Sequence, residues 1–296
     1  MTMRVLVLGA GGQVGFECAA VLRLTAEVLA LTRGQLDITD SDALIAMLQN
    51  WQPDVVVNGA AYTNVQEAEA KEAQAHAVNA RAVGILGEQA KKRRFGLIHF
   101  STDYVFDGRK DGAYEEGDTP CPLNAYGRTK LEGERALIEA DAPALILRTA
   151  WVYGMRTHNF VSTILRLARS RPVVSVVTDQ RGNPTFCRDL AEAVALLSSR
   201  LQGQRGGFEA WRAWRGVYHL AGQGMCSRFE LAQAVLSLDP RRSEHLVRHI
   251  VPITSPELAS SVCRPERVNL NTNLAFERLG IRLPPWRMSL QRALAG

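Results

Sequence analysis

The sequence predicts an α/β protein in which a doubly wound parallel sheet is followed by a smaller C-terminal lobe. Three observations predict this fold. The chain has 296 residues, of which 46% are hydrophobic and 22% charged, so it can bury a sizeable core. Short apolar runs alternate with helical periodicity through the first half, which is typical of crossover units on a parallel sheet. A glycine-rich turn directly follows the first apolar run, Arg4–Leu8.

The elements of the first half are expected in a regular order. Continuous apolar runs of this length predict strands that are buried on both faces. They lie at Arg4–Leu8, Val28–Leu31, Asp54–Asn58, Leu97–Phe100 and Ala144–Leu147. Between them, helical periodicity predicts helices over Gln13–Leu24, Ser41–Asn50, about 67–93 and about 126–139. Ser41 is expected to be the N-cap of the second helix.

The regular alternation ends near Ala150. Five prolines, at 252, 256, 265, 284 and 285, interrupt the tail, which favours a small irregular lobe rather than a second parallel sheet. Residues 202–216 contain four glycines, with Trp211 and Trp214 among arginines. We interpret this segment as an exposed loop or insertion of unknown role.

Composition excludes several classes of protein. The five cysteines are scattered and unpaired by spacing, which indicates free thiols in the reducing cytoplasm, and no export signal is expected. No apolar run approaches the ~18 residues of a membrane span, so no membrane partner is expected. The net charge of +5 is too small to indicate nucleic-acid binding. The run Lys91–Arg94 ends a predicted helix, where cations interact favourably with the helix dipole.

The glycine-rich turn predicts a dinucleotide site. Gly9, Gly12 and Gly15 form G-x-x-G-x-x-G where a strand ends and a helix begins. Glycines there permit a tight turn and let the backbone approach a pyrophosphate, which the first amides of the helix can bind. A glycine pattern alone is weak, but the flanking strand and helix make it specific. The residues are therefore interpreted as the phosphate loop of a Rossmann-like fold.

The end of the second strand indicates which dinucleotide is bound. A site selective for NAD usually has Asp or Glu there, whereas Arg accommodates a 2′-phosphate. This strand ends in Arg33, and the next acid is Asp37. NADPH is therefore favoured as the cofactor, and NADH remains the alternative. Arg33 could instead be a surface cation that contacts no cofactor, which is the other interpretation of this residue. Asp37 and Ile38 are expected beside the adenine.

Three further residues predict carbonyl chemistry. Thr102 follows the fourth strand at the sheet's C-terminal edge, and Tyr126 and Lys130 lie four residues apart on one helical face. A tyrosine with its pKa near 10 exchanges protons poorly unless a nearby cation favours the phenolate, and Lys130 can supply that charge. Thr102 can hydrogen-bond a carbonyl oxygen that becomes an alkoxide. The alternative is that Tyr126 and Lys130 are exposed residues of a surface helix without a catalytic role.

At these residues the chain resembles the extended short-chain dehydrogenase/reductase superfamily, and within it the dTDP-4-dehydrorhamnose reductase family. The resemblance covers about residues 4–290, and STDYVFDG at Ser101–Gly108 is its most specific stretch. The other matching stretches are Gly9–Gly15, Leu36–Asp40, Asn58–Thr63, Pro122–Lys130, Leu147–Tyr153, Asp179–Thr185 and Arg264–Pro265.

The resemblance implies a role for each matching site residue. It implies Tyr126 as proton donor with Lys130 and Thr102 as its partners. Thr102, Asp103 and Trp151 would face a sugar nucleotide. Around the dinucleotide it implies Gly12, Gln13, Val14, Asp37, Ile38, Ala61, Tyr62 and Thr63. Trp151 follows a strand at the edge where ligands bind, so its ring is expected to form a wall for the deoxysugar; packing between the two lobes is the alternative.

The chain also departs from the family pattern. Gln66 stands where an Asp is common, and Asn269 where a Ser is expected. Some members form a magnesium-linked dimer through acidic residues, one of which would be Glu17. The C-terminal acid is missing here, so no metal is expected, and a homodimer remains an alternative to a monomer.

The residues predict an NADPH-dependent oxidoreductase, and the resemblance implies that it converts dTDP-4-dehydro-L-rhamnose to dTDP-L-rhamnose. A reductase or epimerase of another nucleotide sugar, or a non-catalytic NADP-binding regulatory subunit, are the alternatives. Residues 1–150, rejoined by about 184–222, are assigned to the dinucleotide-binding domain. Residues 151–183 and about 223–296 are assigned to the substrate-binding lobe.

Overall fold

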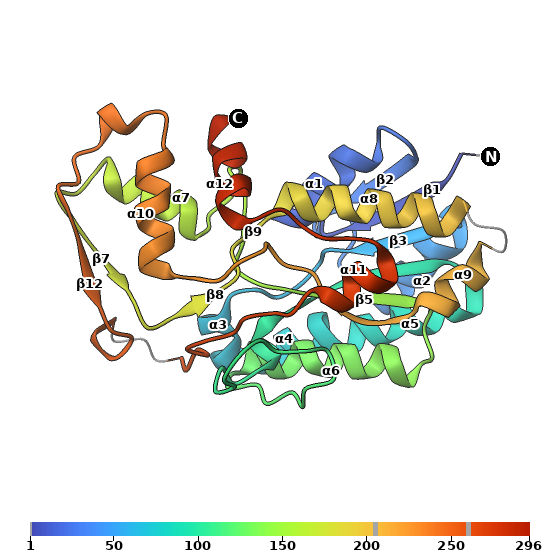
Figure 1. Ribbon diagram of the computed structural model, residues 1–296. Coiled ribbons are helices and arrows are strands. Elements are labelled where there is room, and N and C mark those ends of the chain that lie inside the picture. Colours follow the sequence, from blue (N-terminus) through green and yellow to red (C-terminus); the bar gives the residue numbers. More distant parts are fainter. Residues whose placement is uncertain (1, 204–206, 259–261) are drawn as a thin grey trace.

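The computed structural model describes residues 2–203, 207–258 and 262–296, and a six-stranded parallel sheet lies at its centre (Figure 1). The strands lie in the order β10-β5-β4-β3-β1-β2. They are β1 (Arg4–Leu8), β2 (Glu27–Leu31), β3 (Val55–Asn58), β4 (Gly96–Thr102), β5 (Ala144–Thr149) and β10 (Gly216–His219). The order runs outward from β1 in both directions, which confirms the predicted doubly wound sheet.

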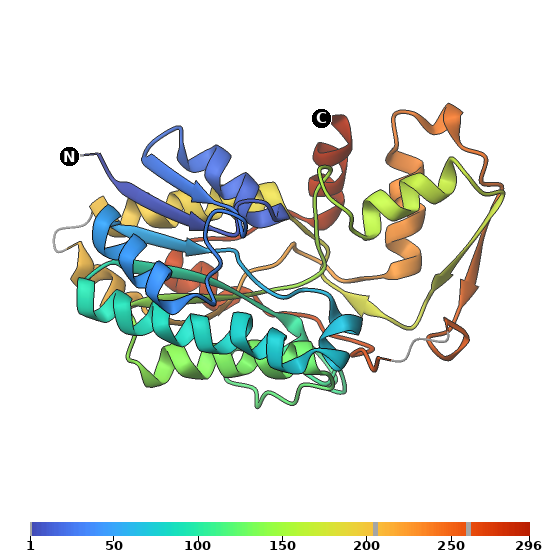
Figure 2. The same cartoon turned by 180° about the vertical axis from the view of Figure 1, so that it is seen from behind.

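Helices cover both faces of this sheet because successive strand residues point to opposite sides. Val5 and Val7 pack into one core cluster, whereas Leu6 and Leu8 pack into another. The first cluster lies under α1 (Gln13–Leu22), α8 (Cys187–Gly203), α9 (Phe208–Trp214) and α11 (Asn273–Leu279). The second lies under α2 (Ser41–Trp51), α5 (Ala82–Arg93) and α6 (Ala125–Glu139). Figures 1 and 2 show the resulting three layers.

A smaller unit lies beside the C-terminal edge of the sheet (Figure 1). Its helices α7 (Phe160–Ala168), α10 (Arg228–Leu238) and α12 (Trp286–Ala295) surround a separate hydrophobic cluster. Two-stranded sheets complete it. They pair β7 (Val173–Val177) with β12 (His249–Ile253), β8 (Arg181–Gly182) with β11 (Cys226–Ser227), and β6 (Val152–Tyr153) with β9 (Thr185–Phe186). The described part of this unit thus contains short helices and two-stranded sheets and no second large parallel sheet, as the prolines of the tail predict.

The region predicted to be helical, about 67–93, is helical apart from Lys71 but is divided into several elements. The chain forms α3 (Val65–Ala70), α4 (Glu72–His76), a π-helical turn at Ala77–Arg81 and then α5. Lys71, with φ −127° and ψ 43°, separates the first two helices. The predicted N-cap of α2 is wrong by one residue, because the Asp40 side chain accepts the Ala43 amide and Ser41 is already helical.

The predicted exposed loop at 202–216 is likewise wrong for the part that the structure describes. α8 ends at Gly203, residues 204–206 lie outside the described ranges, and α9 begins at Phe208. The Trp211 side chain is fully buried. A Cβ on Gly96, at the start of β4, would lie 2.1 Å from the Trp211 ring. The segment therefore forms part of the core on one face of the sheet.

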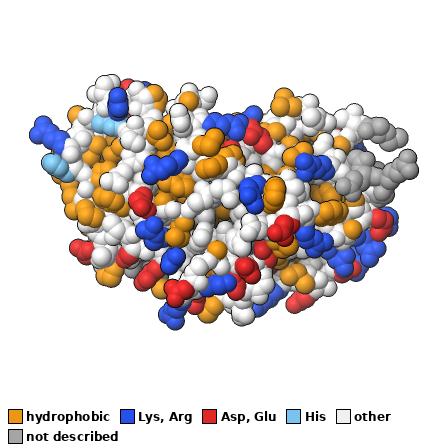
Figure 3. Space-filling model, in the orientation of Figure 1, with side chains coloured by type: hydrophobic (Ala, Val, Ile, Leu, Met, Phe, Trp, Pro, Cys, Tyr) orange, Lys and Arg blue, Asp and Glu red, His pale blue; other side chains and the backbone are white. Residues whose placement is uncertain are grey.

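Charged side chains of both signs are mixed over the face drawn in Figure 3. The basic run at Lys91–Arg94 lies at the end of α5, as predicted, and two of its members form ion pairs. Lys91 lies 3.5 Å from Asp141, and Arg94 lies 3.1 Å from Glu209. Among the described helices, none is long and apolar enough to cross a membrane.

Candidate active site

The loop between β1 and α1 is so tight that two of its positions accept only glycine. Gly9 has φ +72°, and a Cβ on it would lie 2.5 Å from the Ala60 nitrogen. A Cβ on Gly15 would lie 2.3 Å from the Gly9 carbonyl oxygen. Gly12 is the N-cap of α1 and places no side chain over the first helical turn. The first N–H groups of α1, which have no partner within the helix, are therefore uncovered and suited to an anion.

This loop lies between two adjoining clefts at the C-terminal edge of the sheet. Gly12, Gly59 and Ala61 are in the walls of both. The smaller cleft, about 240 Å³, is lined by residues predicted to bind the dinucleotide: Gly9, Arg33, Asp37, Ile38, Ala61 and Tyr62. The larger, about 530 Å³, is lined by Gln13, Val14, Thr63, Thr102, Asp103, Tyr126, Lys130 and Trp151. The structure thus brings the predicted catalytic residues to the loop.

Arg33 and Asp37 lie together at the mouth of the smaller cleft. The Arg33 Nε is 3.2 Å from Asp37 Oδ2, and 82% of the Arg33 side chain is exposed. Hydrogen bonds from the Thr39 amide and hydroxyl hold the Asp37 carboxylate and lower its pKa. An exposed pair of this kind contributes little to stability, so the Arg33 guanidinium can turn to a ligand at small cost.

Tyr62 is held in the cofactor cleft by a residue that sequence analysis missed. Asn79 lies in the π-helical turn, accepts the Tyr62 amide at 2.8 Å and donates to the Tyr62 carbonyl oxygen at 3.2 Å. It also donates to the Thr129 hydroxyl of α6 at 3.1 Å. π-Helical turns often mark functional sites. Here the turn fixes the segment after β3 against the helix that carries Tyr126.

Thr102 and Tyr126 face the larger cleft from β4 and α6. Asn124 caps α6 by accepting the Gly127 amide, which sets Tyr126 in the first helical turn. Burial raises the pKa of the Tyr126 hydroxyl, the negative charge of Asp103 raises it further, and the Thr102 hydroxyl opposes the shift. The phenol is therefore held neutral, which is the form that donates a proton.

Lys130 is placed differently from the expectation. Its Nζ donates to the Phe100 carbonyl oxygen at 2.6 Å and lies 3.1 Å from His99 Nε2. His99 in turn contacts the Asn58 amide nitrogen through Nδ1 at 3.1 Å. Burial lowers the Lys130 pKa to about 8. The Lys130 ammonium is thus directed at β4, and burial, not this lysine, dominates the Tyr126 pKa.

A buried ion pair supports the strand end that carries Thr102. Arg148 of β5 contacts Glu134 of α6 at 2.7 Å, and both side chains are almost completely buried. The Ser101 hydroxyl donates to the same carboxylate. Removing one member of such a pair leaves a buried charge without its partner, which costs about 3–5 kcal/mol. The pair therefore fixes β4 and β5 to α6 just below the site.

Asp103 and Trp151 complete the wall opposite the loop. The Thr102 hydroxyl donates to Asp103 Oδ1 at 3.1 Å, and burial raises the Asp103 pKa to about 7. Trp151 has φ +45°, a conformation that is uncommon outside glycine. Its ring packs on Gly182, where a Cβ would lie 2.6 Å away. The guanidinium of Arg228 lies 3.6 Å from the ring centroid, so Trp151 both lines the cleft and packs between segments of the two lobes.

Other residues of the cleft carried no clear signal in the sequence. Asn159 donates to the Gln13 side chain at 3.0 Å and thereby joins the α7 N-terminus to the glycine loop. Arg228 comes directly after the N-cap of α10 and is far from Trp151 in sequence. His99 alone had a usable signal, because a polar residue inside an apolar strand requires a buried partner. The other contacts join residues that are distant in the sequence, so they become visible only in the folded structure.

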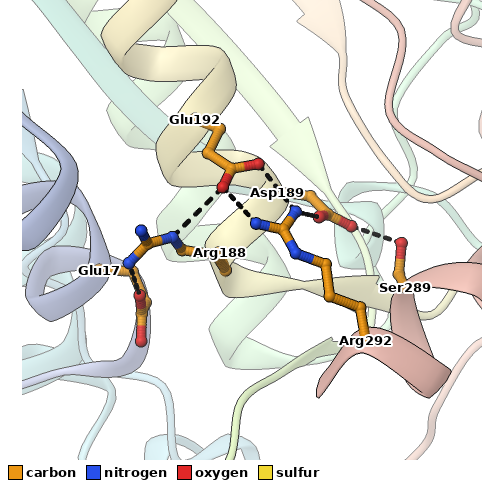
Figure 4. Close-up of polar contacts among 6 residues, drawn as sticks. All are labelled: Glu17, Arg188, Asp189, Glu192, Ser289 and Arg292. Atoms are coloured by element: carbon orange, nitrogen blue, oxygen red, sulfur yellow. Dashed lines mark hydrogen bonds and ion pairs between the residues drawn. The ribbon is translucent and has the colours of Figure 1, made fainter. Parts of the chain in front are cut away.

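The acid that the resemblance links to magnesium, Glu17, is already paired (Figure 4). Arg188 lies 3.2 Å from Glu17 and 3.3 Å from Glu192, while Arg292 contacts both Glu192 and Asp189. Within the described ranges, no group of three or more His, Cys, Asp and Glu side chains could hold a metal ion. Arg188 and Arg292 thus form ion pairs with all three acids of this cluster, Glu17, Asp189 and Glu192, and the absence of a metal stays a prediction.

Comparisons with known proteins show the family to which the chain belongs. The model of a family described as RmlD substrate binding domain matches residues 3–296. The chain is 40% identical over 293 residues to a dTDP-4-dehydrorhamnose reductase of Burkholderia thailandensis, covering 97% of each chain. It is 36% identical to a dTDP-4-keto-6-deoxy-D-glucose reductase of Streptomyces niveus, covering 99% of this chain and 97% of that one.

A solved structure shows the same fold with a nucleotide bound. The crystal structure of dTDP-4-dehydrorhamnose reductase from Bacillus anthracis in complex with NADP superposes with a TM-score of 0.89 at 30% identity. The match covers 100% of this chain and 99% of that chain. The similarity therefore extends over both the sheet and the smaller unit.

Proposed function

This chain belongs to the RmlD substrate binding domain family, and from that premise we propose that it reduces dTDP-4-dehydro-L-rhamnose to dTDP-L-rhamnose with NADPH. One observation carries the proposal: the glycine loop and the Thr102, Tyr126 and Lys130 side chains line one cleft of about 530 Å³. That volume is typical of a small-molecule site. The relatives named as dTDP-4-dehydrorhamnose reductases support the choice of substrate.

The cofactor would lie across both clefts. Gly9, Gly15 and Gly59 let the glycine loop pack tightly against the chain that follows β3, and the uncovered first amides of α1 would bind the pyrophosphate. Arg33 would bind the 2′-phosphate, and Asp37, Ile38 and Tyr62 would surround the adenosine. When bound, NADPH supplies the hydride that reduces the carbonyl carbon.

Tyr126 is proposed to give the proton that completes the reduction. The ketone carbon gains a hydride, its oxygen gains the phenolic proton of Tyr126, and the phenolate later recovers a proton from water. The neutral phenol suits this role, because burial raises the Tyr126 pKa. Thr102 would hydrogen-bond the carbonyl oxygen as negative charge develops on it. Lys130, held by His99 and the Phe100 carbonyl, would place its ammonium near the cofactor.

A reductase acting on a different dTDP-keto sugar is the second candidate. It is favoured by the relative named dTDP-4-keto-6-deoxy-D-glucose reductase, which is 36% identical. The two candidates share the chemistry at C4 and differ in the stereochemistry of the sugar that the cleft accepts. Only a comparison of substrates can separate them.

A panel of keto nucleotide sugars tests the proposal. The purified enzyme is mixed with NADPH and each sugar, and NADPH oxidation is followed by absorbance. We expect the highest kcat/KM with dTDP-4-dehydro-L-rhamnose, and at least a tenfold preference for NADPH over NADH. A higher kcat/KM with another dTDP-keto sugar would support the second candidate. An epimerase would instead retain oxidised cofactor through purification, which the absorbance spectrum reveals, and a regulatory subunit would consume no NADPH.

We also propose the division of labour within the chain. Residues 1–150 and about 184–222 would bind the dinucleotide, and residues 151–183 and about 223–296 would bind the sugar nucleotide. The pairing of β10 with β5 supports the return to the first domain. The homodimer and the cytoplasmic location also remain proposals, to be checked by light scattering after gel filtration and by cell fractionation.

A further inference from the structure

Glu69 connects α3 to the first turn of the helix that carries Tyr126. Its Oε1 accepts the backbone N–H of Ala125 at 2.7 Å, and Ala125 directly precedes Tyr126. The two bonded residues lie 56 positions apart in the sequence. Both α3 and α4 pack against α6 (Figure 1). The hydrogen bond therefore holds the backbone beside the proposed proton donor from a different helix.

The Ala125 amide needs an acceptor from outside its own helix. It belongs to the first turn of α6, whose N–H groups have no acceptor within the helix. The Asn124 side chain accepts the Gly127 amide instead, and Ala125 is fully buried. A buried amide without an acceptor costs free energy, and a carboxylate also suits the positive end of the helix dipole. Glu69 thus completes the cap of α6 that Asn124 begins.

One small apolar cluster lies between the cofactor cleft and this turn. Ala68 of α3, Ala75 of α4 and Ala125 of α6 are fully buried in it, and Tyr62 and Tyr126 pack against it. Tyr62 lines the smaller cleft, whereas Tyr126 lines the larger one. Alanine has no rotamer with which to fill a wider gap, so the Tyr126 ring must follow any shift between α3 and α6. The Glu69 bond sets the spacing of these helices.

We propose that Glu69 is a positioning residue for the reduction, because its bond to the Ala125 amide fixes where the Tyr126 hydroxyl meets the substrate carbonyl. The inference rests on the proposed function, in which Tyr126 donates the proton. Glu69 lines neither cleft, so it acts through the backbone of α6. Proton transfer requires heavy atoms within hydrogen-bond reach, and a displacement of about 1 Å can lower a rate by about 10²-fold.

Steady-state kinetics of two Glu69 variants tests this inference, with NADPH and dTDP-4-dehydro-L-rhamnose as substrates. Glu69→Ala removes the acceptor, whereas Glu69→Gln keeps an oxygen that can accept the Ala125 amide. We expect Glu69→Ala to lower kcat by roughly tenfold, with KM for the sugar and Kd for NADPH unchanged. Glu69→Gln should keep most of the parental kcat, since it loses only an exposed contact with Arg128 at 4.0 Å.

Two measurements without turnover accompany the kinetics. Hydrogen–deuterium exchange followed by NMR should show faster exchange of the Ala125 amide in Glu69→Ala than in the parent and in Glu69→Gln. The thermal midpoint should stay near that of the parent, because the Glu69 side chain is 38% exposed and its removal leaves no cavity in the core.

Glu72→Ala is the matched control. Glu72 also joins α4 to α6, but it does so through the Arg128 side chain, whose Nε and Nη2 each lie 3.0 Å from its carboxylate oxygens. This variant removes a contact with the same helix and leaves the Ala125 amide bonded. It should therefore retain the parental kcat, and a loss equal to that of Glu69→Ala would overturn the inference.

Four other results would also overturn it. They are parental kcat in Glu69→Ala, unchanged exchange of its Ala125 amide, equal losses of kcat in the Ala and Gln variants, and a lowered thermal midpoint with both ligands weakened. The last result would mean that Glu69 supports the fold as a whole. Each of these results leaves the proposed function intact, whereas a parent enzyme that consumes no NADPH with this sugar would refute the proposed function itself.

Discussion

Gly15→Ala is the sharpest test of the glycine loop, because the structure gives the size of the clash. The added methyl carbon would lie 2.3 Å from the Gly9 carbonyl oxygen and 2.8 Å from the Gly9 carbonyl carbon. Ordinary contacts lie beyond 3.4 Å, so α1 and the loop must separate by roughly 1 Å. Backbone shifts of this kind cost about 1–3 kcal/mol. We expect the thermal midpoint to fall by about 2–6 °C in a chain of this length.

The same displacement should weaken the cofactor more than the fold. The first N–H groups of α1 would move away from the pyrophosphate position, and we expect the Kd for NADPH to rise at least tenfold, or about 1.4 kcal/mol. Fluorescence titration with NADPH measures this value. Gly34→Ala is the matched control, since its methyl carbon would meet no atom within 4 Å and Gly34 lines neither cleft. The reasoning is refuted if the two variants bind NADPH equally well.

Three further changes test the remaining roles. Tyr126→Phe should lower kcat by ~10²-fold or more with NADPH affinity unchanged, and parental turnover in this variant would remove Tyr126 from the mechanism. Arg33→Ala should weaken NADPH by about 1.5–3 kcal/mol and spare NADH in parallel titrations; equal losses would mean that Arg33 does not contact the 2′-phosphate. Because burial raises the Asp103 pKa from 3.8 to about 7, the folded chain keeps a proton between these values that the unfolded chain loses. The free energy of unfolding therefore falls as the pH rises through this window, by at most ~4 kcal/mol. Asp103→Asn should raise the thermal midpoint relative to the parent more at about pH 8 than at about pH 4, and a pH-independent difference would contradict this account.

The sheet was predictable because its strands are buried on both faces. A continuous apolar run such as Val55–Val57 is stable only where both faces of the strand are buried, as they are in a parallel sheet covered by helices. The tight turn at Gly9–Gly15 was predictable for a similar reason, since glycine is required where backbones meet. Both features therefore leave a clear signal in the local sequence.

The features that sequence analysis missed depend on distant contacts. The Lys130 ammonium turns to His99 and the Phe100 carbonyl, 31 and 30 residues away. Arg228 meets the Trp151 ring although the two residues lie far apart in the sequence. The helix at Phe208–Trp214 can pack on the sheet because Gly96 leaves space for the Trp211 ring. The hydrophobic periodicity of one segment does not indicate which residues from distant segments will contact it.

Isotope transfer tests the central claim most directly. The enzyme is supplied with NADPH deuterated at the transferable position of C4 and with dTDP-4-dehydro-L-rhamnose, and the sugar product is analysed by mass spectrometry and NMR. The account predicts dTDP-L-rhamnose carrying one deuterium on C4 of the sugar, with one NADPH consumed per molecule formed. Product without deuterium at C4, or no consumption of NADPH while the parent enzyme still binds both ligands, would contradict it.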